Sequence, residues 1–209
     1  MNRRDAIGRV ALIMGGAVIG AEFFLSGCKP NGASSVDDLF KQDNVDFLNE
    51  VAETILPATS SPGAKAANVG QFMAVMVRDC YTPVDQKSFL EGLSKLNDAA
   101  EKKFSVKFME LSPAQRTELL IAADKDQKEY YTKLYKKIDA DMAKHKGDAN
   151  YQEPDQPNHY FRMIKELTLL GFFTSEVGAT KALRYIETPG RYDGCMPYKK
   201  GDKAWAVDD

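Results

Sequence analysis

Residues 82–104 read TPVDQKSFLEGLSKLNDAAEKKF, and this segment indicates the fold class of the chain. Thr82 is a favoured N-cap residue, and Pro83 fits the first helical position, where its missing N–H costs nothing. Behind this start, apolar side chains recur at the spacing of one helix face: Phe89, Leu93, Leu96, Ala100 and Phe104. The segment is therefore predicted to be an amphipathic helix that buries one side.

The segments before residue 82 show the same pattern. Asp43 and Asn44 are cap candidates for a helix that should end at Pro57, and residues 58–70 are predicted to be a loop rich in Ser, Gly and Ala. The apolar positions of this helix are Phe47, Leu48, Val51, Ile55 and Leu56. A further helix is predicted from the apolar positions Phe72, Met73, Val75, Met76 and Cys80.

The segments after residue 104 are helical as well. Ser112-Pro113-Ala114-Gln115 has the pattern of a capping box, which should open a helix running to about His145. After a polar loop, a last long helix is predicted over about residues 158–173 and a shorter one over about residues 179–186. No alternating strand pattern of useful length appears. We therefore predict an all-α fold of five to seven helices in one domain, with an irregular C-terminal tail.

The tail that begins at Thr188 is rich in turn residues and aromatic side chains. Because Tyr, Trp and Arg contribute most of the binding energy at protein interfaces, its aromatic residues are candidates for docking a partner, together with the aromatic pair that ends the last long helix. These candidates are Phe172, Phe173, Tyr192, Tyr198 and Trp205. The alternative is a strap that packs on the chain's own helices.

The amino end has the composition of an export signal. Arg3 and Arg4 match the twin-arginine address, an apolar run follows over residues 10–25, and Leu25-Ser26-Gly27-Cys28 resembles a bacterial lipobox. We predict a signal peptide over residues 1–27, a lipidated Cys28 with its tether over residues 28–43, and a helical domain over residues 44–209. The domain would then be held at a membrane through lipid on Cys28.

The alternative for this segment is a transmembrane anchor that is never cleaved. The apolar run has about sixteen residues and is interrupted by Glu22 and by glycines, each of which weakens a helix by about 1 kcal/mol. A helix that spans a bilayer needs about twenty apolar residues. The composition therefore favours the lipoprotein signal over the anchor.

The charge balance and the cysteines restrict the partners and the compartment. The chain has 28 Lys and Arg residues against 30 Asp and Glu residues, which argues against nucleic acid as a partner. Apart from Cys28, the cysteines are Cys80 and Cys195. In an oxidising compartment these two are predicted to form an internal disulfide, and the alternative is that one of them bonds to a partner chain.

Motifs that carry chemistry are missing from the sequence. His145 and His159 are the two histidines, and each lies near the end of a predicted helix, where a surface or capping role is expected. Neither has a Cys or carboxylate at metal-ligand spacing, and no nucleophile elbow, phosphate loop or haem-attachment motif occurs. We therefore assign no catalytic, cofactor-binding or metal-binding residue to this chain.

Several short motifs resemble those of the gluconate 2-dehydrogenase subunit 3 family. The opening motif is Glu53-Thr54-Ile55-Leu56-Pro57-Ala58-Thr59, followed by Pro62-Gly63-Ala64 and Ala67-Asn68-Val69. The closing motifs are Gly171-Phe172-Phe173-Thr174-Ser175 and Pro189-Gly190. The resemblance spans roughly residues 44–200, and a twin-arginine signal is usual for this family.

The resemblance implies a small, non-catalytic subunit of a periplasmic dehydrogenase complex. The large subunit of such a complex is a flavoprotein of the glucose–methanol–choline (GMC) type that carries FAD and oxidises a sugar or sugar acid. A cytochrome c often accepts the electrons. The small subunit carries the export signal and is expected to escort its partner through the twin-arginine translocase.

The lipobox is a departure from the family, whose members are not usually anchored by lipid. It raises the question of whether such a complex needs a cytochrome as its membrane anchor. A different class of function also fits the sequence, namely a free-standing envelope lipoprotein that acts as a binding or scaffold module. An enzyme in its own right is the least favoured of the three, because no nucleophile, metal or cofactor motif is found.

Overall fold

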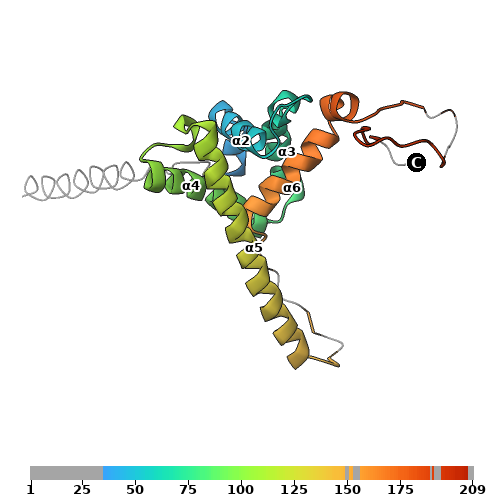
Figure 1. Cartoon of the computed structure of the whole chain (residues 1–209). Coiled ribbons are helices and arrows are strands. Elements are labelled where there is room, and N and C mark those ends of the chain that lie inside the picture. The colour runs from blue at the N-terminus through green and yellow to red at the C-terminus, as the bar shows by residue number, and fades with distance from the viewer. Residues whose placement is uncertain (1–34, 149–150, 153–155, 189, 191–193, 207–209) are drawn as a thin grey trace, which may run out of the picture. The chain divides into compact units, whose positions relative to one another are not determined.

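The computed structural model describes residues 35–148, 151–152, 156–188, 190 and 194–206 (Figure 1). Along the chain lie η1 (Val36–Phe40), α2 (Gln42–Ile55), η2 (Ala64–Ala67), α3 (Val69–Cys80), α4 (Pro83–Phe104), η3 (Phe108–Glu110), α5 (Pro113–Lys144), α6 (Tyr160–Phe173) and η4 (Gly178–Ala182). Within these residues there is no strand, so the predicted all-α fold is confirmed. Arg3, Arg4, Cys28 and Tyr192 lie outside the described residues.

Two of the predicted helix starts are confirmed in atomic detail. The Thr82 hydroxyl accepts a hydrogen bond from the backbone N–H of Asp85 at 3.3 Å, with Pro83 in the first turn of α4. At the start of α5, the Ser112 hydroxyl accepts from the N–H of Gln115, and the Gln115 side chain accepts from the N–H of Ser112 at 2.9 Å. Such caps satisfy N–H groups that have no partner inside the helix.

The hydrophobic core lies where α2, α3, α4 and α6 pack together. Its largest buried side chains include Leu48, Met73, Phe89, Ile164 and Phe172. Burying one such side chain contributes about 1.5–3 kcal/mol to folding. Helix α4 lies close against α6 at Gly92, where an added Cβ would lie 2.2 Å from the Tyr160 Cβ. The absence of a side chain at Gly92 therefore sets the contact between these two helices.

Several boundaries differ from the prediction. The stretch over residues 58–70, predicted to be a loop, contains η2 and the start of α3 at Val69. Helix α2 begins at Gln42, so Asp43 and Asn44 lie in its first turn and do not cap it; the Asn44 amide instead donates to the Asp38 carbonyl at 2.8 Å. The short helix predicted over residues 179–186 is reduced to η4. The cause is the tail, because the Arg184 N–H donates to the Ala204 carbonyl at 2.8 Å and cannot continue a helix.

The long helix α5 has two parts with different surroundings. Its buried side chains are Leu119, Leu120 and Ala123, which all lie in its first third. From residue 124 to residue 144 no described side chain is fully buried, and Figure 1 shows this part of α5 running on past the other helices. We call residues 124–144 the arm. None of the described helices combines the length and apolar character that crossing a bilayer requires.

Candidate partner-docking site

The opening motif of the sequence forms the connection between α2 and η2. The Glu53 carboxylate accepts hydrogen bonds from the backbone N–H groups of Ala58 at 2.9 Å and Lys65 at 2.8 Å. Gly63 lies so close that an added Cβ would be 2.3 Å from Glu53 Oε1. Glu53 and Gly63 therefore hold the shape of this connection together, which gives both residues a structural role.

A second polar cluster closes the connection at the start of α3. The Asn49 side chain is only 7% exposed, and its Oδ1 accepts from the Gly70 N–H at 2.8 Å. Its Nδ2 donates to the Asn68 side chain at 3.1 Å, and Asn68 adopts a left-handed conformation with φ of 51°. Asn tolerates this conformation better than most residues. The left-handed backbone therefore explains why the Ala67-Asn68-Val69 motif has Asn at residue 68.

A cluster of charges ties α5 to α2 and to η2. Arg116 Nη1 lies 2.5 Å from Glu50 Oε2, and Lys65 forms an ion pair with the other carboxylate oxygen. Arg116 also donates to the carbonyls of Phe108 at 3.3 Å and Met109 at 2.7 Å. The hydrogen bond from Lys65 lowers the pKa of Glu50, aided by the charges of Lys65 and Arg116 and opposed by partial burial. All these partners are internal, so the cluster stabilises the fold.

The two histidines have the helix-end positions predicted for them. His145 is the C-cap of α5 and stacks on Tyr151 with ring centroids 4.2 Å apart. His159 is the N-cap of α6: its Nδ1 accepts from the Phe161 N–H at 3.3 Å, and its Nε2 lies 3.2 Å from Asp126 Oδ2. Burial lowers the pKa of His159, and the nearby Asp126 opposes the shift. The described residues include no group of three or more His, Cys, Asp or Glu side chains placed to hold a metal.

The aromatic residues that were predicted to dock a partner differ in how far their side chains are exposed. Phe172 is 2% exposed and lies in the core, so its assignment to a docking surface is wrong: α6 turns this side chain inward against the other helices. Phe173 is 37% exposed, Tyr198 76% and Trp205 40%. Of the aromatic pair, only Phe173 is therefore available to a partner.

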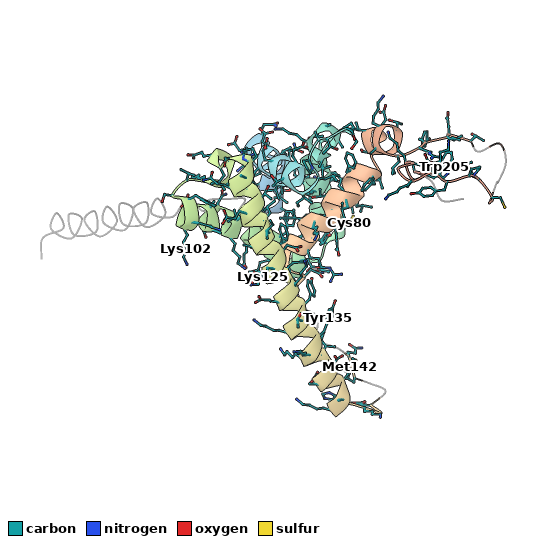
Figure 2. The ribbon with its side chains drawn as sticks, in the orientation of Figure 1. Cys80, Lys102, Lys125, Tyr135, Met142 and Trp205 are labelled. Carbon is teal, nitrogen blue, oxygen red and sulfur yellow. The ribbon has the colours of Figure 1, made fainter. Side chains whose placement is uncertain are left out.

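The C-terminal tail also folds back on the chain, as the strap alternative anticipates. The Arg184 guanidinium lies 5.5 Å from the centroid of the Trp205 ring and forms an ion pair with Asp202 at 3.1 Å. The Ala206 N–H donates to the Arg184 carbonyl at 2.7 Å, and Figure 2 shows Trp205 within this tail. Part of the aromatic surface of Trp205 is thus used inside the chain.

The structure does not join Cys80 and Cys195 by a disulfide, contrary to the interpretation favoured from the sequence. Both residues are exposed, and Cys80 lies at the last position of α3. Its thiol contacts the Met76 sulfur of the same helix at 4.0 Å. The thiol of Cys80 is therefore directed along its own helix. Cys195 lies in the C-terminal tail, which pairs with the backbone of Arg184.

A further surface lies between α5 and α6, and the sequence did not reveal it. A groove of about 450 Å³ is lined by Tyr131, Tyr135, Arg162 and Leu169 together with Gln127, Lys128, Thr132, Lys165 and Glu166. The Arg162 guanidinium lies 4.5 Å from the centroid of the Tyr131 ring, while Tyr135 is 52% and Leu169 41% exposed. Figure 2 shows Tyr135 and Met142 following each other along the arm. We call Tyr131, Tyr135, Arg162, Leu169 and Phe173 the α5–α6 face.

Sequence reasoning missed this face because its residues have ordinary helical spacing. Tyr131 and Tyr135 are four residues apart in a regular helix, a pattern that is equally expected of a core-facing stripe. The available signal was length: α5 extends from Pro113 to Lys144, and its second half carries many charged residues. A helix much longer than its core-facing part must expose the remaining apolar side chains.

The structure is that of a small all-helical protein. The polar clusters around Glu53, Asn49 and Arg116 hold its helices and connections together, and its exposed aromatic side chains include Phe173, Tyr198 and Trp205. Residues 42–190 match the family model of gluconate 2-dehydrogenase subunit 3, and the chain belongs to this family. The resemblance stated from the motifs is thereby confirmed. Membership implies association with a larger dehydrogenase subunit. No curated protein and no solved structure gives a significant match to the chain.

Proposed function

We propose that this chain is the non-catalytic accessory subunit of a periplasmic dehydrogenase that uses FAD to oxidise a sugar or sugar acid. The observation that carries the proposal is the family match over residues 42–190, which covers all five α-helices of the described chain. FAD is expected in the large GMC-type subunit, and a cytochrome c is a candidate electron acceptor. This chain contributes binding and delivery instead of the oxidation itself.

The roles of the motif residues support an accessory function. Glu53 would be an obvious candidate for a catalytic carboxylate, yet it accepts two backbone hydrogen bonds from Ala58 and Lys65. Glu50 is likewise held by Arg116 and Lys65. Both carboxylates are held by donors of this chain and stabilise its fold, so the motif containing Glu53 is a signature of this helical scaffold.

Export of two chains on one signal would explain why this chain carries a twin-arginine address at its amino end. The twin-arginine route carries folded proteins, and a flavoprotein must take up FAD in the cytoplasm before transport. Arg3 and Arg4 would then address both this chain and its bound partner. Lipid on Cys28 would hold the exported complex at a membrane, where a buried acyl chain contributes about 0.8 kcal/mol per methylene.

A deletion experiment tests the escort role. The gene for this chain is removed, or Arg3 and Arg4 are both replaced by Lys, and the dehydrogenase activity and flavin are measured in cytoplasmic and periplasmic fractions. The expected result is an active flavoprotein that stays in the cytoplasm. Replacing Arg9 by Lys outside the pair is the matched control and should leave export intact. Export of an active flavoprotein without this chain would refute the escort role.

A further inference from the structure

We propose that the α5–α6 face is the surface on which this chain binds the catalytic subunit of the dehydrogenase. The inference rests on the proposed function and specifies where the two chains meet. It assigns the main contact to Tyr131, Tyr135, Arg162, Leu169 and Phe173. Tyr198 and Trp205 of the tail, which the sequence favoured, are assigned no part in this contact.

The arm is the first reason, because its two sides are covered unequally. On one side the returning chain packs against it: the Tyr130 hydroxyl donates to the Pro157 carbonyl at 2.7 Å, and Tyr151 contacts Asp141 and His145. On the other side Tyr135 is 52% and Met142 47% exposed. Most helical stability in proteins comes from packing an apolar face, and here one such face is open.

Helix α6 extends the open surface. Arg162, Leu169 and Phe173 recur at helical spacing and so lie on one side of α6. Leu169 also lines the groove with Tyr131 and Tyr135, which joins the two helices into one surface. Leu170 beside it is 46% exposed. Adjoining exposed apolar groups, rimmed by charges, are typical of a protein–protein contact.

The groove is already ordered for binding. Arg162 Nε donates to Glu166 at 2.7 Å, its Nη1 donates to the Tyr135 hydroxyl at 3.4 Å, and its guanidinium lies over the ring of Tyr131. Binding would therefore cost little side-chain entropy at the two tyrosines and the arginine. Tyr and Arg are also the residue types in which interface binding energy concentrates.

The groove also indicates the chemistry of the partner's surface. The exposed side chains of Tyr135 and Leu169 fit an inserted apolar side chain. The basic residues of the lining are already paired within the chain, Lys128 and Lys165 with Asp124 and Arg162 with Glu166. An apolar anchor is thus the expected counterpart on the catalytic subunit.

The extent of the family match favours this face over the tail. The match covers residues 42–190 and so includes α5 and α6, whereas Tyr198 and Trp205 lie beyond it. An association that belongs to the family as a whole should use the part of the chain that the family shares. The matched region contains the α5–α6 face in full.

The test uses the complete, tagged chain and the flavoprotein that co-purifies with it. Tyr135→Ala and Leu169→Asp are expected to raise the Kd for the purified flavoprotein by about tenfold or more, as for interface hot spots. Tyr198→Ala and Lys133→Ala are the matched controls, since both side chains are exposed and neither lines the groove. These controls should change the Kd by less than about threefold. Unchanged far-UV circular dichroism and Tm establish that the variants fold.

The outcomes separate this inference from the proposed function. If the wild-type chain captures no flavoprotein, both fail. If it captures the flavoprotein and the Tyr135 and Leu169 variants bind as tightly as the wild type, the inference alone fails. It also fails if these substitutions break a homodimer of the isolated chain without affecting the flavoprotein, since the face would then join two copies of this chain.

Discussion

Arg116 on α5 lies 2.5 Å from Glu50 on α2, and the two side chains are only 15% and 18% exposed. This ion pair fixes the base of α5 against the bundle, and the guanidinium also donates to the carbonyls of Phe108 and Met109. Together with the buried side chains of Leu119, Leu120 and Ala123, these polar groups hold the start of α5, and with it the arm, against the bundle.

Replacing Arg116 by Ala is expected to lower the free energy of unfolding by about 2–4 kcal/mol, since it leaves Glu50 and two carbonyl groups with fewer donors in a partly buried site. Urea denaturation followed by circular dichroism measures the change. Lys87→Ala is the control: Lys87 pairs with Glu91 at 3.9 Å on an exposed surface, and its loss should cost less than about 0.5 kcal/mol. Equal effects of the two substitutions would contradict the importance given to Arg116.

The same cluster predicts how stability depends on acid pH. The pKa of Glu50 is lower in the folded chain than in the unfolded chain, so the unfolded chain binds a proton more readily. The stabilisation is complete above the unfolded pKa, near 4.5, and is lost as the pH falls through the lower folded value. Glu50→Gln should therefore have a weaker dependence of unfolding free energy on pH below about 5. A variant as acid-sensitive as the wild type would contradict this assignment.

Protonation of His159 is expected to lower the stability of the chain in a second, higher pH range. Its folded pKa lies below its ordinary value of 6.5 because of burial, so stability should fall as the pH drops below about 6.5. Protonation would also remove the acceptor that caps the Phe161 N–H. His159→Asn keeps a good N-cap residue and should reduce the loss of Tm between pH 7 and pH 5.5. An unchanged Tm profile in this variant would show that another group titrates.

The contact between α4 and α6 predicts a steric effect at Gly92. A methyl group there would overlap Tyr160, so Gly92→Ala should lower the free energy of unfolding by about 1–3 kcal/mol, despite the better helix propensity of Ala. Thermal unfolding measures this change. Gly190→Ala is the control, because an added Cβ meets nothing within 4 Å among the described atoms. A stabilised Gly92→Ala variant would show that α6 moves aside easily.

Much of the fold follows from the sequence because the decisive signals are local. Thr82, Pro83 and Ser112 mark helix starts through hydrogen bonds within four residues, and the structure has those caps. The end of the short helix after α6 was not predictable in this way. It is set by pairing between Arg184 and Ala204, which are far apart in the chain.

The candidate site was harder to predict for the same reason. Phe172 and Phe173 are neighbours with the same side chain, and only the packing of α6 decides that the first is buried and the second is half exposed. The groove combines Tyr135 of α5 with Leu169 of α6, and no local pattern reports that these two helices meet there. The family motifs identified the scaffold because Glu53 and Gly63 act through short-range contacts.

The most direct test of the central claim is to purify the tagged, full-length chain from its own cells in mild detergent and to record the absorption spectrum and subunit composition. We expect a yellow complex that contains this chain and one larger flavoprotein with bound FAD, together with dehydrogenase activity toward a sugar or sugar acid. A lone, colourless chain without a flavin-containing partner would contradict the claim that it is a dehydrogenase subunit and would favour a free-standing lipoprotein.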